Sequence, residues 1–266
     1  MSPRSGLFTP SEPLLPLLCG EDPPPLELHN PNGQAPVLLV CDHASRLVPG
    51  GLGGLGLAPS AFDLHIAYDI GAAEVALLLS KRLDAALLSA GYSRLVIDLN
   101  RGLDQPTLIP EASDGIIISG NLGLSHAARG ARIEALYHPW HRAVTTELRR
   151  LDTRTKVRGA LIGVHSFTPR LNGSARPWQV GVLWDGDCKL ARPLMAALAG
   201  EGLSVGDNQP YTARNPSGGT LETHALDQGR PGLSIEIRQD LIADERGCVE
   251  WADRLGGVLG RLLCRI

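Results

Sequence analysis

The segment "PVLLVCDHAS" (residues 36–45) decides the fold. Its short apolar run turns polar at its end, as a buried parallel strand does where it leaves the carboxyl edge of a sheet. Apolar residues then recur at helical spacing over 69–91, and "YSRLVIDLNR" (92–101) follows as a second strand-like run. We interpret these pieces as strand, helix and strand, a βαβ unit whose two strands are parallel and end at the same edge.

Helix-like and strand-like segments continue to alternate along the rest of the chain. After a loop at 102–124, the sequence predicts helices at 126–151, 187–200 and 249–265, and strands at 159–166, 178–184 and 232–240. This alternation predicts an α/β fold with one mixed, mostly parallel sheet flanked by helices. In such folds the functional site lies at the carboxyl ends of the strands.

The chain has 266 residues, of which 43% are hydrophobic, and this suits one large domain with a substantial core. Residues 1–35 are rich in Pro, which fixes φ and removes a backbone donor, so we expect an irregular N-terminal segment there. Residues 36–266 are expected to form the single domain.

Composition narrows the classes of function. The net charge is -3 and basic residues are scattered, so no surface for nucleic acid or anionic membrane is indicated. No apolar run reaches the roughly 20 residues that span a bilayer. The five Cys are odd in number and show no CxxC spacing, which indicates a reducing, cytoplasmic setting. We expect a small-molecule partner; the oligomeric state is left open.

Four strand-like runs end in chemically active side chains. Because parallel strands end at one edge of a sheet, residues remote in sequence are expected to meet in one pocket. These residues are His43 in "CDHAS", His165 in "GVHS", Glu236 in "IEIR", and Asp98, Asn100 and Arg101 in "DLNR".

Two imidazoles, one carboxylate and an open position for water make up the ligand set of a catalytic zinc. His43 and His165 would supply the imidazoles, and we favour Asp69, before a helix, as the carboxylate. Plain capping of that helix explains Asp69 equally well. Glu74 and His65 are alternative ligands.

The remaining polar residues of "DLNR" fit the surroundings of such a metal. A zinc-bound His usually gives its other ring N–H to a carboxylate, and Asp98 is placed to accept it from His43. Asn100 and Arg101 offer an amide and a planar cation, which together grip a substrate carboxylate. Arg94 either reaches the same cavity or pairs on the surface.

Other catalytic devices find little support. A Cys nucleophile at Cys41 is not favoured, because this residue lies within an apolar run. The Gly-rich segment at 47–57 lacks the Lys-Ser/Thr ending of a phosphate-binding loop.

Several of these segments resemble the N-formylglutamate amidohydrolase family, over roughly residues 36–260. The segments that carry the resemblance are "VCDHAS", "HIAYDIGA", "YSRLVIDLNR", "GVHSFTP", "DNQPY" and "IEIRQDLI". The resemblance implies a catalytic domain over 36–266 with a fold similar to the zinc-dependent carboxypeptidases, which are zinc exopeptidases.

The resemblance also implies roles for individual residues. In the carboxypeptidases a His-x-x-Glu pair and a second His bind zinc, an Asn-Arg pair grips a terminal carboxylate, and a late Glu is the general base. The matching positions here are His43, Asn100 with Arg101, His165 and Glu236. The chain departs from the pattern at Arg46, three residues after the first His, and the carboxylate ligand is therefore moved to Asp69.

The activity implied is a metal-dependent amidohydrolase that cleaves the N-formyl or N-acyl amide bond of an acidic amino acid such as N-formyl-L-glutamate. Arg94 would stabilise the oxyanion, and Arg238 and Arg176 could serve instead, particularly in binding a second carboxylate of the substrate. Two other functions stay open: a zinc carboxypeptidase or deacylase for a larger acyl or peptidyl substrate, and a non-catalytic protein that binds acidic metabolites.

Overall fold

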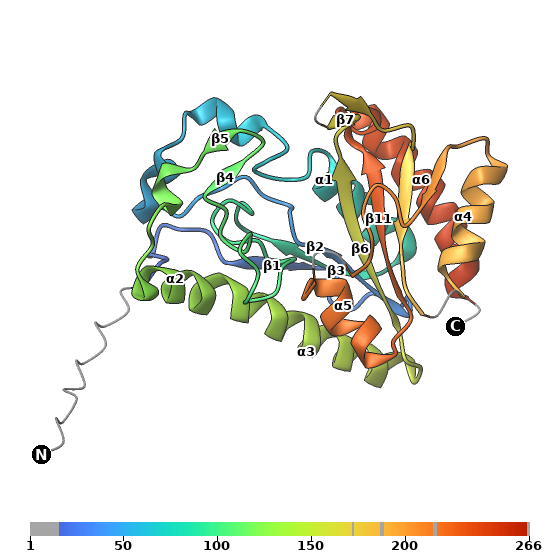
Figure 1. Ribbon diagram of the computed structural model, residues 1–266. Helices are drawn as coiled ribbons and strands as arrows, with labels where there is room; N and C mark the ends of the chain where they lie inside the picture. Colours follow the sequence, from blue (N-terminus) through green and yellow to red (C-terminus); the bar gives the residue numbers. More distant parts are fainter. Residues whose placement is uncertain (1–15, 172, 187–188, 215–216, 265–266) are drawn as a thin grey trace, which may run out of the picture.

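The computed structural model describes residues 16–171, 173–186, 189–214 and 217–264. Its centre is a seven-stranded sheet with strand order β1-β3-β2-β6-β11-β9-β10 (Figure 1). The strands in that order are β1 (Leu26–His29), β3 (Ala86–Ala90), β2 (Val37–Cys41), β6 (Ala160–Phe167), β11 (Gly232–Arg238), β9 (Val180–Leu183) and β10 (Val205–Asp207).

The four central strands, β3, β2, β6 and β11, are parallel to one another. At one edge β1 is antiparallel to β3, and toward the other edge β9 is antiparallel to β11 and carries β10 parallel to itself. All residues of β2 and β6 are buried, as expected of strands covered on both faces. The predicted α/β fold with a mixed, mostly parallel sheet is confirmed.

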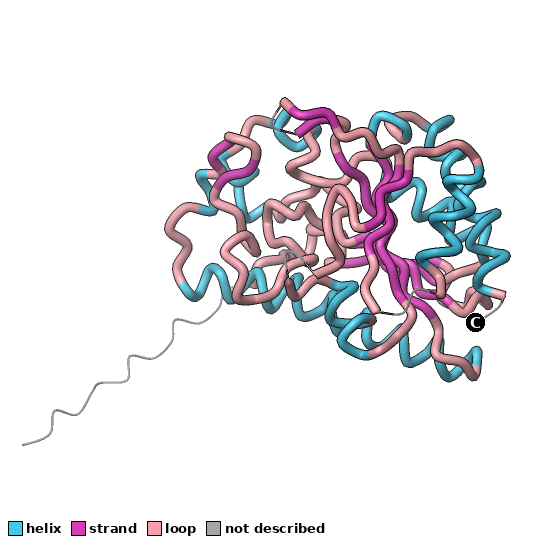
Figure 2. The backbone as a smooth tube through the Cα atoms, turned by 45° about the vertical axis from the view of Figure 1, so that its right-hand side comes forward, coloured by secondary structure: helices cyan, strands magenta, loops and turns pink. Residues whose placement is uncertain are grey.

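Helices and loops cover both faces of the sheet, and Figure 2 shows the strands running between them. The alternate residues of β2 belong to two core clusters, Val37 and Leu39 to the one on one face of the sheet, and Leu38 and Val40 to the one on the other face. The helices are α1 (Ala72–Leu83), α2 (His126–Arg132), a π-helical turn (Ile133–Tyr137), α3 (His138–Thr155), α4 (Ala191–Gly200), α5 (Thr220–His224) and α6 (Glu245–Leu263).

Shorter elements lie in the connecting segments. Two small hairpins, β4 (Ala112–Ser113) with β5 (Ile116–Ile117) and β7 (Arg170–Leu171) with β8 (Ser174–Ala175), stand apart from the main sheet. The 3-10 helices are Gly50–Gly56, Pro59–Asp63, Ser119–Asn121, Leu226–Gln228 and Gln239–Leu241. No helix among the described residues is both long enough and apolar enough to cross a bilayer.

Most of the predicted elements after residue 101 are present. The predicted helix at 126–151 is the continuous run from α2 to α3, and the predicted closing helix is α6. The strands predicted at 159–166, 178–184 and 232–240 are β6, β9 and β11. The helix predicted at 187–200 is observed from Ala191, and its residues 187 and 188 lie outside the described residues.

The predicted helix at 69–91 is too long, and the predicted strand at 92–101 is absent. The helix ends at Leu83, where Asp84 takes a left-handed conformation with φ 52°, and the strand β3 occupies Ala86–Ala90. Residues 92–101 form buried turns instead of a strand. The apolar run of β3 continues the helical spacing of α1, and a short apolar run does not by itself separate helix from strand.

The expectation of an irregular segment over 1–35 is wrong for Leu26–His29. These residues form β1, which pairs with β3 in the register Leu26 with Ala90 and Leu28 with Leu88. A four-residue edge strand that follows three Pro residues gives almost no periodic signal. Residues 1–15 lie outside the described part of the chain.

Gly71 allows the chain to turn into α1 beside the sheet edge. Its φ is 78°, and a Cβ there would clash with the carbonyl oxygen of Ile242. A left-handed conformation costs an L-residue roughly 1–2 kcal/mol, and the clash with backbone adds to this. We therefore expect Gly71→Ala to lower the free energy of unfolding by about 2 kcal/mol or more.

Gly257→Ala is the matched control, because Gly257 lies within α6 and a Cβ there meets nothing closer than 3.9 Å. That variant should gain about 0.5–1 kcal/mol from helix propensity. Urea unfolding of the two variants and the wild type measures both changes. Equal stability of Gly71→Ala and the wild type would contradict the steric account.

Candidate active site

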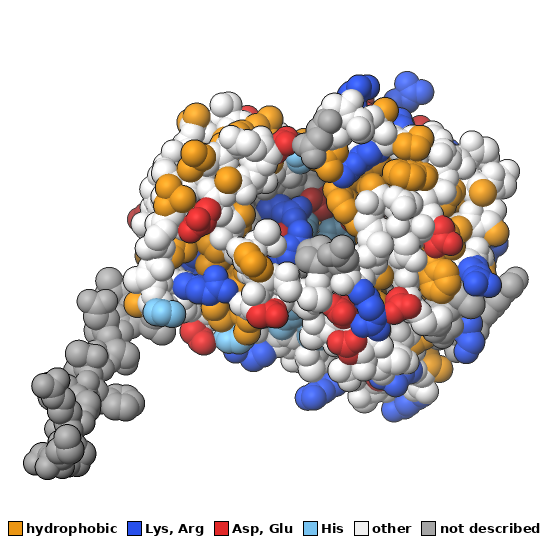
Figure 3. Space-filling model, in the orientation of Figure 1, with side chains coloured by type: hydrophobic (Ala, Val, Ile, Leu, Met, Phe, Trp, Pro, Cys, Tyr) orange, Lys and Arg blue, Asp and Glu red, His pale blue; other side chains and the backbone are white. Residues whose placement is uncertain are grey.

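A polar cavity opens at the carboxyl ends of the central strands, and Figure 3 shows the hollow with Lys or Arg side chains inside it. Polar side chains from the segments that follow β2, precede α1 and follow β3 reach this cavity. The predicted site residues that line it are His43, Asp69, Arg94, Asn100, Arg101, His165 and Glu236.

Three neighbouring strands bring sequence-remote residues to the cavity. His43 lies two residues after the end of β2, and His165 lies within β6. Glu236 in β11 is the direct register partner of His165. The parallel alignment of β2, β6 and β11 therefore explains why these three segments meet.

Asp69 comes from the loop that precedes α1, and main-chain contacts fix its place. Its backbone N–H donates to the carbonyl of His43 at 3.0 Å. The next residue is also anchored, because the Ser166 hydroxyl donates to the carbonyl of Ile70 at 2.8 Å. The loop is thereby tied to the ends of both β2 and β6.

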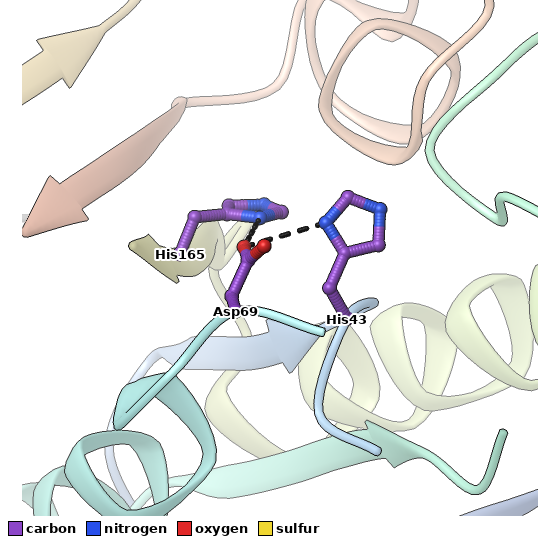
Figure 4. Close-up of side chains that lie close together, drawn as sticks. All are labelled: His43, Asp69 and His165. Carbon is purple, nitrogen blue, oxygen red and sulfur yellow. Dashed lines mark hydrogen bonds and ion pairs between the residues drawn. The ribbon is translucent and has the colours of Figure 1, made fainter. Parts of the chain in front are cut away.

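The two imidazoles converge on the Asp69 carboxylate (Figure 4). Asp69 Oδ2 lies 3.3 Å from His43 Nδ1 and 3.0 Å from His165 Nδ1. The ring centroids are 5.3 Å apart, and all three side chains are buried. Helix capping does not account for Asp69, because α1 begins at Ala72 with Gly71 as its N-cap and no side-chain capping bond.

The three donors fit a divalent cation. One ligand atom each from His43, Asp69 and His165 can be chosen so that all lie within 4.8 Å of one another. Two imidazole nitrogens and one carboxylate oxygen are the donor set of many catalytic zinc sites, which keep a fourth position for water or substrate. The sequence-remote histidines are thus close enough to share an ion.

Asp98 and Arg94 contact the side chains of this cluster. Asp98 Oδ1 is 2.8 Å from His43 Nε2, the contact expected from the sequence. Arg94 donates to Asp98 Oδ2 at 2.7 Å and to Asp69 Oδ1 at 3.5 Å. Asp98 therefore holds the outer side of the His43 ring, and Arg94 bridges the two carboxylates.

The pKa values of these groups show how strongly they interact. Burial alone would raise the pKa of Asp69, but the His43 and His165 rings lower it far below its usual value. For His165 the directions are reversed. Burial alone would lower its pKa, but the hydrogen bond to Asp69 and the charges of Asp42 and Glu236 raise it to about 10. The site is therefore electrostatically suited to hold positive charge.

Glu236 differs from the other carboxylates. Burial raises its pKa to about 7, against the opposing influence of His165. The side chain is buried, and its Oε2 has no hydrogen-bond partner among the described residues. A carboxylate that lines the cavity and titrates near neutral pH has the properties of a general base.

Asn100 and Arg101 line the same cavity. Asn100 Oδ1 accepts from the backbone N–H of Thr220 at 2.9 Å, which ties this segment to α5. Arg101 Nη1 donates to the carbonyl of Asn100 at 2.8 Å, and its Nη2 lies 3.8 Å from Asp98 Oδ2. Its buried Nε has no partner among the described residues.

Three residues considered from the sequence do not join the group. Arg238 does not line the cavity, because the strand ends there and its guanidinium pairs with Asp240 at 2.8 and 3.2 Å. Glu74 is exposed on the first turn of α1. His65 lies 3.6 Å from Asp114 and outside the His43, Asp69 and His165 cluster.

Two residues near the site, the buried Asp42 and the half-buried His141, were missed in the sequence. Asp42 is 1% exposed, and its only sequence signal is an acid immediately before His43. His141 of α3 lies with Nδ1 2.8 Å from Nε2 of His224. Nothing in a helical segment rich in Arg distinguished His141.

The His141 and His224 pair should make stability depend on pH. Burial lowers the pKa of each ring to about 4, and for His141 the neighbouring His224 adds to this. Below the pKa of about 6.5 that His has in the unfolded chain, both histidines become protonated when the chain is unfolded but stay neutral in the native structure. The free energy of unfolding should therefore fall between about pH 6.5 and pH 4, by roughly 3 kcal/mol for one such ring.

Removing one ring tests this directly. His224→Asn should show a smaller loss of stability than the wild type over that pH range in chemical unfolding. The control is His126→Asn, because His126 is exposed at the start of α2. Parallel pH curves for the wild type and His224→Asn would rule out buried neutral rings.

Comparison with known proteins shows the family of this chain. The chain matches the family model of N-formylglutamate amidohydrolase over residues 35–243. It is thus a hydrolase of amide bonds by class, with a small-molecule substrate. The chain belongs to the N-formylglutamate amidohydrolase family. A search of curated proteins finds no match.

Two solved structures resemble the whole molecule. The crystal structure of gene product Atu2144 from Agrobacterium tumefaciens has 36% sequence identity and a TM-score of 0.89, and the match covers 94% of this chain and 98% of that one. The N-formylglutamate amidohydrolase from Ralstonia eutropha JMP134 has 21% identity and a TM-score of 0.66, with 91% and 98% covered. The second likeness shows the shared fold.

Proposed function

We propose that this chain is a zinc-dependent amidohydrolase that removes the N-formyl group from an acidic amino acid, with N-formyl-L-glutamate as the reference substrate. The products would be formate and L-glutamate. One observation carries the proposal: a His, Asp and His cluster, a buried unpartnered Glu236 and a guanidinium with an unused N–H all line one cavity.

In the proposed site His43, Asp69 and His165 hold the metal. A zinc ion bound there would lower the pKa of a water molecule and polarise the amide carbonyl. Asp98 keeps the His43 ring in place through its contact with Nε2. Glu74 and His65, the alternative ligands considered from the sequence, are not needed.

Glu236 is assigned the role of general base. It takes a proton from the attacking water as the water oxygen bonds to the amide carbon. It then gives that proton to the leaving nitrogen as the C–N bond breaks. The raised pKa of Glu236, about 7, suits both halves of this cycle near neutral pH.

The role of each arginine is assigned from the groups that its guanidinium already contacts. Arg94 contacts both Asp69 and Asp98, and we assign it to the negative charge that develops on the carbonyl oxygen. Arg101 keeps its Nε free and is assigned, with Asn100, to a substrate carboxylate. Arg176 is the candidate for a second carboxylate, since it donates to Tyr211 Oη at 3.1 Å and Tyr211 lines the cavity.

Substitution of the proposed base is the first test of this function. Glu236→Gln should lower kcat/KM for N-formyl-L-glutamate about 10²–10⁴-fold, measured as formate release, because the variant cannot accept a proton. The wild-type rate should rise with pH through about 7, where Glu236 loses its proton, and this limb should be absent in the variant. Zinc content should be unchanged, since Glu236 is not a proposed ligand.

Glu74→Gln serves as the control, because Glu74 is exposed on α1 and should leave the rate unaltered. N-acetyl and peptidyl glutamates in the same assay separate a deformylase from a broader deacylase or carboxypeptidase. A Glu236→Gln enzyme with the wild-type rate would refute the assignment of the base.

Substitution of Arg101 tests recognition of the substrate carboxylate. Hydrogen bonds to charged groups contribute about 1.5–3 kcal/mol, so Arg101→Gln should raise KM for N-formyl-L-glutamate roughly 10-fold to 150-fold. Two analogues of N-formyl-L-glutamate, each with one carboxylate amidated, show which carboxylate Arg101 binds. For the analogue that lacks this carboxylate, Arg101→Gln and the wild type should have the same KM. Arg254→Gln, which removes an exposed pair with Glu201, is the control. An unchanged KM in Arg101→Gln would remove Arg101 from the binding site.

A further inference from the structure

The two histidines of the cluster are oriented in the same way. His43 turns Nδ1 toward Asp69 and Nε2 toward Asp98, at 3.3 and 2.8 Å. His165 also turns Nδ1 toward Asp69, at 3.0 Å, and its Nε2 lies 3.8 Å from Asp42 Oδ1. Each ring thus has its Nδ1 at the centre of the site and a buried carboxylate on its outer side.

The side chain of Asp42 interacts by charge with His165, and also with His141 and His224. Its side chain is 1% exposed, and neither carboxylate oxygen has a hydrogen-bond partner among the described residues. A buried carboxylate without a partner is costly, so its presence calls for an explanation. Within the described chain, His165 is the basic group that lies within ion-pair distance of Asp42.

The strand around His165 leaves room on the Nε2 side of the ring. Gly163 lies two residues earlier in β6 and therefore on the same face of the strand. A Cβ at Gly163 would lie 3.3 Å from His165 Nε2 and 2.6 Å from Ser234 Oγ. The absence of a side chain there keeps this edge of the ring open toward its neighbours.

We propose that Asp42 is a positioning residue for His165, the counterpart of Asp98 for His43, so that both rings keep their proton on Nε2 and bind the metal through Nδ1. This rests on the proposed zinc site. A metal-binding imidazole usually gives its second N–H to a carboxylate, which fixes the tautomer and raises the basicity of the ring. Asp42 is the buried carboxylate on the Nε2 side of the His165 ring, at ion-pair distance (3.8 Å).

Zinc affinity of Asp42→Asn is the test, measured by competition with a chelator. The variant should bind zinc about 10-fold to 100-fold more weakly than the wild type, and Asp98→Asn should lose a similar factor. Asp63→Asn, at an exposed ion pair with Arg46, should bind zinc as the wild type does.

Two further measurements separate positioning from a structural role. Without metal, Asp42→Asn should remain folded at neutral pH in the absence of denaturant, so that weaker zinc binding by this variant reports on the His165 ring and not on loss of the fold. Nitrogen-15 NMR of the zinc-loaded wild type should show a proton on Nε2 of both His43 and His165.

The outcomes are distinct. If the wild type binds zinc and Asp42→Asn binds it equally tightly, or if His165 coordinates through Nε2, the role of Asp42 is refuted while the zinc site stands. A loss of stability without metal that accompanies unchanged zinc affinity also assigns Asp42 to structure alone. If the wild type binds no zinc, the proposed metal site fails and the role of Asp42 fails with it.

Discussion

The rest of the site depends on one contact, the Asp69 carboxylate between two imidazoles. One oxygen of Asp69 lies 3.3 Å from His43, 3.0 Å from His165 and 3.3 Å from the backbone nitrogen of Ser166. The sheet supplies the two rings from neighbouring parallel strands, and the turn at Gly71 allows the loop with Asp69 to enter α1 beside them. The fold therefore serves to bring three short segments to one point.

The balance of charge explains why such a point would hold a cation. Asp42, Asp69 and Asp98 are buried around the two rings, and Arg94 pairs with the last two. In the absence of an ion the rings themselves carry the compensating protons, as the raised pKa values of His43 and His165 indicate. Binding of a divalent ion would displace those protons, so affinity for the metal should couple to pH.

The residues of the site could be predicted from the sequence more accurately than the positions of the helices and strands. Polar residues at the ends of apolar runs placed His43, His165 and Glu236 in one pocket, because parallel strands share an edge. The strand β3 was hidden in a helical pattern, and residues 92–101 form turns instead of a strand, yet Asn100 and Arg101 still line the cavity. Asp42 and the Asp240 partner of Arg238 depend on side-chain contacts that no pattern of residues discloses.

The central claim is that His43, Asp69 and His165 bind one metal ion that hydrolysis requires, and the metal content of the purified chain tests it most directly. Elemental analysis of protein prepared without chelators should find about one zinc per chain, and His165→Ala should reduce this to a small fraction. Removal of the metal should abolish formate release from N-formyl-L-glutamate, and added zinc should restore it. A metal-free chain that hydrolyses this substrate at the full rate would contradict the account.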